Sequence, residues 1–301
     1  MTTQVTKIDK HVLSLSNLEK DLYPAFGFSK AHVLEYYRRV AEFILPHLQN
    51  RALTLKRYPN GAGEEYFFEK RCPAHRPSWV PTAQIPQEGG EDMTVCLVND
   101  LATLMWVENL ASLELHVPLA RSHTRETPDT VVFDLDPGAG AGILECLRVS
   151  LILRDLLAEL KLTCFAKTSG LKGLHVYVPL NQIKTTFEDT KHFSRSVAEV
   201  LERNYPDLVT SKMARGQRTR KVFINWSQND ASKTTVCVYS LRAGEKPTVS
   251  CPRPWNEIEK FVEKGDARTI GVLPFQALDR LSKTGDLFAP VLTLRQELPH
   301  V

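Results

Sequence analysis

The chain has 301 residues, of which 43% are hydrophobic and 24% are charged, and its formal net charge is only +3. This composition is typical of a globular protein, and the small net charge does not by itself indicate a nucleic-acid partner. No apolar run approaches the roughly 18 to 20 residues needed to cross a bilayer, and the N-terminus lacks a secretory signal, so we expect a cytoplasmic protein with no membrane partner.

Alternation and helical spacing of apolar residues predict the elements in chain order. The first part should form a strand and turn at 13–24, a helix at 30–48 capped by Ser29, a hairpin at 53–70, an exposed loop or hairpin tip at 83–93, and a helix followed by a strand at 100–118. The second part should form a strand at 130–137, a helix at 143–161, two strands around a glycine-bearing turn at 162–180, a helix at 187–206, strands at 221–229 and 234–241, and a short helix at 256–265. Strand pairs with flanking helices, without regular alternation, indicate an α+β or layered α/β fold.

The six cysteines are scattered without CxxC spacing. In a chain of this size that pattern predicts reduced, mostly buried thiols and no disulfide framework. Cys72 and His75 form the only Cys/His pair close enough to suggest a metal. Because no second pair lies nearby, a zinc site is the less favoured interpretation.

The segment TVVFDLDP places two carboxylates at the end of a predicted strand. Side chains alternate across a strand, so Asp134 and Asp136 share one face while Phe133 and Leu135 share the other. Two adjacent carboxylates repel unless a cation lies between them, and hard oxygen ligands suit Mg²⁺ or Mn²⁺. A lone DxD is weak evidence, because many are merely polar strand ends.

Two further segments combine polar groups with turns or strands. TSGLKGLH supplies Ser169, Lys172, Gly173 and His175 in a setting that suits a triphosphate, although a polar hairpin turn explains it as well. KVFINWSQN places Asn225 inside an apolar run, which an edge strand would also explain. The basic run at residues 211–221 either neutralises phosphates or is a solvated loop.

Together DLDP, TSGLKGLHVYVP, KVFINWSQN and KTTVCVYSLR resemble the polymerase domain of bacterial ligase D and its archaeal stand-alone relatives, within the archaeo-eukaryotic primase superfamily. LSNLEKDLYPAFGFSK, FFEK, NLASLELHVP and PRPW extend the resemblance over nearly the whole chain. It implies an α+β primase-polymerase fold with a central, mostly antiparallel sheet, flanking helices and a smaller N-terminal lobe. The single domain would span residues 1–301, with that lobe at roughly 1–100, the catalytic sheet at roughly 101–250 and a helical tail at 251–301.

The resemblance also implies an activity, namely template-directed addition of nucleotides or ribonucleotides at DNA breaks and gaps in non-homologous end joining. Such enzymes use two divalent ions, Mn²⁺ or Mg²⁺, take nucleoside triphosphates, bind DNA with a 5′-phosphorylated gap or overhang, and work with Ku and a DNA ligase. The implied metal positions are Asp134, Asp136 and Asn225. The implied nucleotide contacts are His116, Ser169, Lys172, Gly173, His175, Gln228 and Arg242. The implied DNA contacts are Lys20 and Lys30 at a 5′-phosphate, Phe67 and Phe68 at the template, and Arg218 and Arg220 at the primer strand.

Asn225 departs from the family pattern, which has an aspartate at this position. An amide offers one neutral oxygen and accepts no proton, so activation of the primer 3′-hydroxyl should suffer most. Nucleotide binding should survive. A substitution introduced into the chain and a catalytically silent family member are both open explanations. Two other functions also remain open: a replicative primase, and a non-catalytic scaffold that binds DNA ends.

Overall fold

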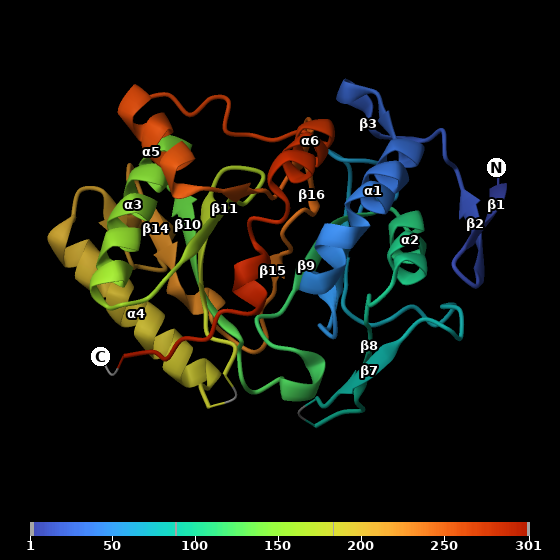
Figure 1. Cartoon of the computed structure of the whole chain (residues 1–301), viewed down its shortest axis with the longest axis horizontal. Helices are drawn as coiled ribbons and strands as arrows, with labels where there is room; N and C mark the ends of the chain where they lie inside the picture. The colour runs from blue at the N-terminus through green and yellow to red at the C-terminus, as the bar shows by residue number, and fades with distance from the viewer. Residues whose placement is uncertain (1–2, 88, 183, 300–301) are drawn as a thin grey trace. The chain divides into compact units, whose positions relative to one another are not determined.

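The computed structural model describes residues 3–87, 89–182 and 184–299. The chain forms two units, each assembled from segments that are separated in sequence (Figure 1). Unit 1 comprises Met1–His123, Thr234–Val249 and Leu273–Gly285, and unit 2 comprises Thr124–Lys233, Ser250–Val272 and Asp286–Val301. The two units are of similar length.

Unit 1 combines one sheet with several two-stranded pairs. Its elements are β1 (Thr3–Ile8), β2 (His11–Ser16), β3 (Asp21–Tyr23), β4 (Phe28–Ser29), α1 (Lys30–Leu48), β5 (Thr54–Arg57), β6 (Phe67–Glu69), β7 (Thr82–Ile85), β8 (Met93–Cys96), α2 (Leu101–Asn109), β9 (Ser112–Val117), β15 (Thr235–Val236), β16 (Leu241–Ala243), β17 (Pro247–Val249) and α6 (Pro274–Thr284). The four-stranded sheet has the order β15-β9-β5-β6, and β1-β2, β3-β4, β7-β8 and β16-β17 form pairs. Helix α1 packs against α2 and α6.

Unit 2 is built on a six-stranded sheet. Its elements are β10 (Thr130–Pro137), α3 (Ile143–Glu159), β11 (Phe165–Thr168), β12 (Leu174–Pro179), α4 (Phe187–Asn204), β13 (Val209–Thr210), β14 (Val222–Asn225), a 3₁₀ turn η4 (Trp226–Gln228), β18 (Pro252–Arg253) and α5 (Trp255–Lys264). The strand order is β13-β14-β10-β12-β11-β18. Every pair is antiparallel except β13-β14, so a mostly antiparallel sheet, as predicted, is present.

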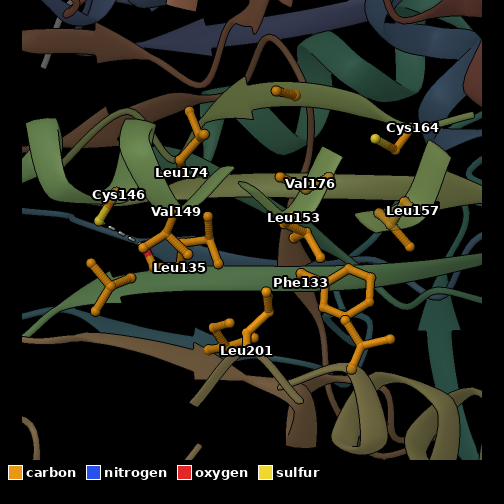
Figure 2. Packing of buried hydrophobic residues seen from close by; sticks show 14 of the residues in the cluster. Phe133, Leu135, Cys146, Val149, Leu153, Leu157, Cys164, Leu174, Val176 and Leu201 are labelled. Carbon is orange, nitrogen blue, oxygen red and sulfur yellow. Dashed lines mark hydrogen bonds between the residues drawn. The ribbon is translucent and has the colours of Figure 1, made fainter. Parts of the chain in front are cut away.

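Strand β10 has one apolar and one acidic face, and this alternation positions the site. Phe133 and Leu135 are fully buried in a core that includes Leu153 of α3 and Leu201 of α4. Figure 2 shows these side chains clustered around β10. Full burial of one leucine side chain stabilises a fold by roughly 1.5 to 3 kcal/mol, so this face is firmly anchored. The acidic residues therefore face the opposite side of the sheet.

The predicted elements at 130–206 and 256–265 match β10, α3, β11, β12, α4 and α5 closely. The predicted strand at 221–229 ends at Asn225 and continues as η4, and within the predicted strand at 234–241 Thr235–Val236 forms β15 and Leu241 begins β16. Ser29 caps α1 as predicted, in a capping box in which the Ser29 backbone amide donates to Nδ1 of His32 over 2.9 Å. Gly265 ends α5 with a left-handed backbone at φ +65°, as predicted. Helix α6 was not predicted as a separate element.

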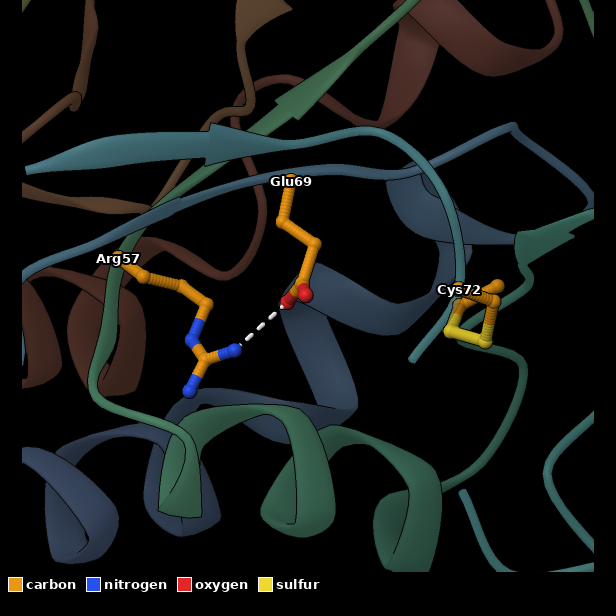
Figure 3. The surroundings of a disulfide bond; sticks show 4 residues. Arg57, Glu69 and Cys72 are labelled. Carbon is orange, nitrogen blue, oxygen red and sulfur yellow. Dashed lines mark hydrogen bonds and ion pairs between the residues drawn. A yellow bond between two sulfur atoms is a disulfide. The ribbon is translucent and has the colours of Figure 1, made fainter. Parts of the chain in front are cut away.

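The prediction that all cysteines are reduced is wrong for one pair. Cys72 and Cys96 form a disulfide across a sequence separation of 24, with their Cα atoms 5.0 Å apart (Figure 3). The bridge ties the segment after β6 to the end of β8, where the Cys72 amide also donates to the Thr94 carbonyl over 2.8 Å. Spacing along the chain could not reveal a proximity that this backbone pairing creates. Cys72 is consequently no candidate metal ligand.

Within the part of the chain that the structure describes, no helix combines the length and the apolar character that crossing a membrane requires.

Candidate active site

Four polar residues form a row across four adjacent strands of unit 2. Asn225 of β14 pairs with Asp134 of β10, Asp134 pairs with His175 of β12, and His175 pairs with Lys167 of β11. Side chains of directly opposed residues lie on the same face of a sheet, so all four point away from the apolar core. The strand register therefore brings together residues that are up to 91 positions apart in the sequence.

The row is joined by hydrogen bonds. Nδ2 of Asn225 donates to Oδ2 of Asp134 over 3.3 Å, and Nε2 of His175 lies 3.2 Å from Oδ1 of the same carboxylate. Nζ of Lys167 lies 3.1 Å from Nδ1 of His175. Burial alone would raise the pKa of Asp134, but His175, Asn225 and Lys167 outweigh it and hold the pKa below the ordinary value of 3.8. Asp134 is therefore ionised at neutral pH.

The second carboxylate, Asp136, lies on the same face of β10 and beside the glycine turn between β11 and β12. A Cβ atom at Gly173 would lie 2.5 Å from the Leu135 carbonyl oxygen and 3.5 Å from Oδ1 of Asp136. Only glycine lets the turn approach the strand this closely. Two carboxylates on one face of a strand fit a hard divalent cation.

Asn225 does not complete a set of three oxygen ligands. Its Nδ2 faces Asp134, and its Oδ1 accepts a hydrogen bond from Oγ of Ser227 over 2.8 Å. Nζ of Lys233 donates in turn to the same Ser227 hydroxyl over 2.8 Å. Consistently, no cluster of three or more His, Cys, Asp or Glu side chains suited to a metal occurs among the described residues. The carboxylate pair fits a cation, whereas the amide turns a donor toward it.

The TSGLKG turn is held by its own serine. Oγ of Ser169 accepts from the amide of Gly173 over 3.1 Å and from that of Leu171 over 3.3 Å, and the Ser169 amide donates to the Gly173 carbonyl over 2.9 Å. Lys172 is exposed at the tip. Gln228 is half-buried in η4, directly after β14.

The basic loop is attached to the segment that follows Asp136. The Gly138 amide donates to the Lys221 carbonyl over 2.9 Å, and the Arg220 amide donates to the Ala139 carbonyl over 2.7 Å. A Cβ at Gly138 would lie 1.8 Å from the carbonyl oxygen of Arg218, so no larger residue fits there. The guanidinium of Arg218 lies 3.6 Å above the ring of Phe223 in β14. The loop is thus a fixed neighbour of the acidic strand.

In unit 1, a buried carboxylate organises His116 and Arg242. Oε2 of Glu114 lies 2.9 Å from Nε2 of His116 and 3.2 Å from Nε of Arg242. Oε1 accepts from the Tyr58 hydroxyl over 3.2 Å and lies 3.5 Å from Nζ of Lys56. Burial alone would raise the pKa of Glu114, but these neighbours lower it to about 2. One anion thus faces two permanent cations, which leaves positive charge for an anionic ligand.

Lys56 also links this cluster to exposed aromatic side chains. Its Nζ lies 4.0 Å from the ring centroid of Tyr66 and 5.7 Å from that of Phe68. Phe67 and Phe68 are 45% and 55% exposed, which is unusual for phenylalanine and leaves both rings accessible to a ligand.

Lys20 and Lys30 lie close together in unit 1. The Lys30 amide donates to the Lys20 carbonyl over 2.8 Å. Nζ of Lys30 donates to the Ser16 carbonyl over 2.7 Å, and that of Lys20 donates to Oδ1 of Asn60 over 3.3 Å. Burial, together with the charges of Arg57 and Lys20, lowers the pKa of Lys30 to about 8. A buried ammonium among other cations is the kind of group that a bound phosphate would stabilise.

Comparison with known proteins agrees with this geometry. A model of the LigD primase-polymerase domain matches residues 29–288. The chain belongs to the LigD primase-polymerase domain family. It is 42% identical over 279 residues to the multifunctional non-homologous end joining protein LigD of Mycolicibacterium smegmatis, covering 92% of this chain and 36% of that protein. It is 33% identical over 273 residues to the bifunctional LigD of Bacillus subtilis, covering 91% of this chain and 43% of that protein.

A solved structure is similar throughout. The polymerase domain of Mycobacterium tuberculosis ligase D in complex with DNA superposes with a TM-score of 0.86 at 36% identity, over 95% of this chain and 99% of that one. The predicted family and α+β primase-polymerase fold are confirmed. The family is one of metal-dependent nucleotidyltransferases, so the predicted enzyme class is confirmed as well. The chain spans less than half the length of the LigD proteins compared above.

Sequence reasoning missed four residues of these clusters: Glu114, Lys56, Arg57 and Lys167. Glu114 lies two positions before His116 on β9, so the i, i+2 spacing of the ELH segment was an available signal. Lys167 directly precedes the TSGLKG turn, yet nothing in the local sequence indicates that a lysine there is fully buried.

Proposed function

We propose that this chain is a template-directed polymerase domain that adds nucleotides or ribonucleotides at DNA breaks and gaps in non-homologous end joining. The observation that carries the proposal is the pair of carboxylates on one face of β10, Asp134 and Asp136, in a chain of this family. In-line attack of a primer 3′-hydroxyl on a nucleoside triphosphate requires divalent cations held by such a pair. Either Mn²⁺ or Mg²⁺ suits the oxygen ligands.

Within unit 2, the proposed nucleotide contacts are Ser169, Lys172, Gly173, His175 and Gln228. Exposed Lys172 can neutralise a phosphate as a point charge, and Gly173 lets the turn backbone approach the ligand closely. Within unit 1, we assign nucleotide contacts to His116 and Arg242. The surplus of positive charge around Glu114 supports binding of the triphosphate there.

The proposed DNA contacts follow from exposure and charge. Phe67 and Phe68 expose ring faces on which template bases can stack, a contact worth about 1 to 3 kcal/mol per base. Lys20 and Lys30 provide clustered cations for the 5′-phosphate at a gap or overhang. Ku and a DNA ligase are the expected partners, because the relatives that match are named as end-joining proteins.

Asn225 is the reason to propose weak catalysis by this chain. In place of a carboxylate that holds a cation and accepts a proton, the site has an amide whose Nδ2 faces Asp134. The cation nearest the primer hydroxyl should bind poorly, while nucleotide and DNA contacts remain. This observation also favours a second candidate function, that of a non-catalytic scaffold that binds DNA ends.

The deciding experiment is extension of a 5′-phosphorylated gapped DNA with Mn²⁺ and ribonucleotides, comparing this chain with its Asn225→Asp variant. We expect the variant to extend the primer and the parent chain to extend it far more slowly. An unprimed template run in parallel tests for primase activity, which we do not expect. If neither form extends the primer although both bind the DNA, the scaffold becomes the better account.

A further inference from the structure

Met213 is an exposed apolar residue in the basic loop of unit 2, which spans residues 211–221. Among the described residues of unit 2, the exposed large hydrophobic residues are Leu171, Tyr205 and Met213. Leu171 lies in the TSGLKG turn, Tyr205 directly follows α4, and Met213 is 51% exposed among polar and basic neighbours. A single exposed apolar residue is ordinary on a protein surface, so the surroundings of Met213 must decide what it can bind.

The backbone around Met213 is held in place by neighbouring elements. Nη2 of Arg218 donates to the Met213 carbonyl over 2.5 Å, and the same guanidinium lies 3.6 Å above the ring of Phe223. Two residues earlier in the loop, the Ser211 carbonyl accepts from Nε1 of Trp226 over 3.0 Å. A loop that is already ordered has less conformational entropy to lose when a ligand covers it. The fold therefore presents the Met213 side chain from a fixed backbone.

Cations surround this methionine, and carboxylates are absent from the loop. The loop contains five basic residues and no acidic one, namely Lys212, Arg215, Arg218, Arg220 and Lys221. Lys212, Arg215 and Arg220 are exposed, whereas Arg218 is half-buried. Exposed cations without a carboxylate among them favour a polyanionic ligand. An apolar side chain in their midst favours a polyanion with apolar surface, and a nucleic acid offers stacked bases between its phosphates.

The loop adjoins the end of the acidic strand of unit 2. The Arg220 amide donates to the carbonyl of Ala139, three residues after Asp136, over 2.7 Å. The TSGLKG turn meets the same strand at the Leu135 carbonyl, which a Cβ atom at Gly173 would approach to 2.5 Å. The basic loop therefore lies where the proposed function brings the 3′ end of the primer strand.

We propose that Met213 is a DNA-contacting residue that inserts its side chain beside the terminal base of the primer strand, while Lys212 and Arg215 neutralise neighbouring phosphates. This inference rests on the proposed function, because that function places the primer terminus at the carboxylate pair. Apolar side chains that enter a base step, methionine among them, partly unstack the bases. The thioether is flexible and polarisable, so the contact should be independent of the identity of the base.

The first test measures unstacking of the terminal base directly. The fluorescent analogue 2-aminopurine, whose emission rises when it is unstacked, is placed at the primer 3′ terminus of a gapped DNA. Protein is added to saturation without metal or nucleotide. We expect the parent chain to raise the emission, Met213→Ala to raise it far less, and Met213→Leu to retain most of the increase. Val12→Ala, which truncates a 65% exposed residue of β2 in unit 1, is the matched control and should behave like the parent.

The second test separates the apolar contact from the electrostatic ones by titrating the same DNA at several salt concentrations. We expect Met213→Ala to bind about 10-fold more weakly at every salt concentration, with an unchanged salt slope, because it removes apolar surface and no charge. Arg215→Gln should instead reduce the salt slope by about 1 and leave the emission increase of the saturated complex intact.

The inference and the proposed function fail in different ways. If Met213→Ala keeps the full emission increase or the parent affinity, the inference is overturned and a protein partner becomes the better occupant of this surface. Primer extension by Asn225→Asp alongside that result would leave the polymerase function standing. If Met213→Ala loses both the emission increase and the affinity but no form extends a primer, the Met213 contact stands and the polymerase function is wrong. A parent chain that does not bind the gapped DNA overturns both.

Discussion

Replacement of Asn225 by aspartate should make the stability of this protein depend on a divalent cation. In the present chain, the amide of Asn225 donates to Asp134 over 3.3 Å, so the pair is stable without a metal. An aspartate at this position would place a second carboxylate oxygen at about the same distance. Two carboxylates this close repel unless a cation or a shared proton lies between them.

The size of the effect follows from the distance. Two unit charges 3.3 Å apart repel by about 5 kcal/mol at an effective dielectric constant of about 20, and by about 1 kcal/mol in bulk water. Uptake of a shared proton limits the cost to about 4 kcal/mol at pH 7, since each pH unit above the ordinary carboxyl pKa of 3.8 contributes about 1.4 kcal/mol. Because the Asp134 side chain is 17% exposed, we expect the free energy of unfolding to fall by roughly 2 to 3 kcal/mol, between the bulk-water value and the shared-proton limit.

Urea denaturation in the presence of a chelator and again with Mn²⁺ measures this directly. We expect Asn225→Asp to be less stable than the parent in chelator and to gain much more stability from Mn²⁺. The double variant Asp134→Asn with Asn225→Asp restores one carboxylate and one amide, so it should recover most of the loss. Equal stability of the single variant and the parent in chelator, with equal gains from Mn²⁺, would refute the reasoning.

Three other predictions concern unit 1. Glu108 is fully buried, neither of its carboxyl oxygens has a hydrogen-bond partner among the described residues, and burial raises its pKa well above the ordinary 4.5. Keeping Glu108 neutral in the folded protein therefore costs about 1.4 kcal/mol of folding stability for each pH unit above 4.5, until the folded pKa is reached. Glu108→Gln should consequently stabilise the protein at pH 7 and hardly at pH 4.5. Urea titrations at both pH values would show this difference. Replacing Cys72 and Cys96 by serine should lower the free energy of unfolding by about 3.5 kcal/mol, the loop entropy for a separation of 24. Added reductant should then have no further effect on the variant. Replacing Lys20 and Lys30 together by glutamine should abolish any preference for 5′-phosphorylated over unphosphorylated gaps in a competition binding assay, and an unchanged preference would remove both from the proposed phosphate site.

Local patterns were sufficient for most elements of unit 2. Phe133 and Leu135 alternate with Asp134 and Asp136, and that alternation already identified both the buried and the acidic face of β10. Ser29 before α1 and Gly265 after α5 marked helix ends, because capping depends on one or two residues. Each of these predictions needed only neighbours in the sequence.

Features that depend on strand pairing were beyond the sequence. The contact of Lys167 with Ser250 joins residues 83 positions apart. The position of Lys167 beside His175 depends on the register of β11 with β12. The disulfide likewise depends on how β8 meets the segment after β6. Helix α6 is a different case, since Pro274 at its first turn and Gly285 at its end are ordinary helix signals that could have been used.

The charges along the polar row explain how this chain tolerates Asn225. The row from Asn225 to Lys167 contains one carboxylate, Asp134, which accepts a hydrogen bond from Asn225 and lies beside His175, so it is stable without a metal. With an aspartate at position 225, the same row would contain two carboxylates, and Asp136 would add a third beside it. A cation would then be required for stability as well as for chemistry. With aspartate at position 225 the row would need a metal ion for stability, whereas with the amide it can bind a metal ion but does not need one. We therefore predict a folded protein that binds nucleotide and DNA while its catalytic cation is only loosely held.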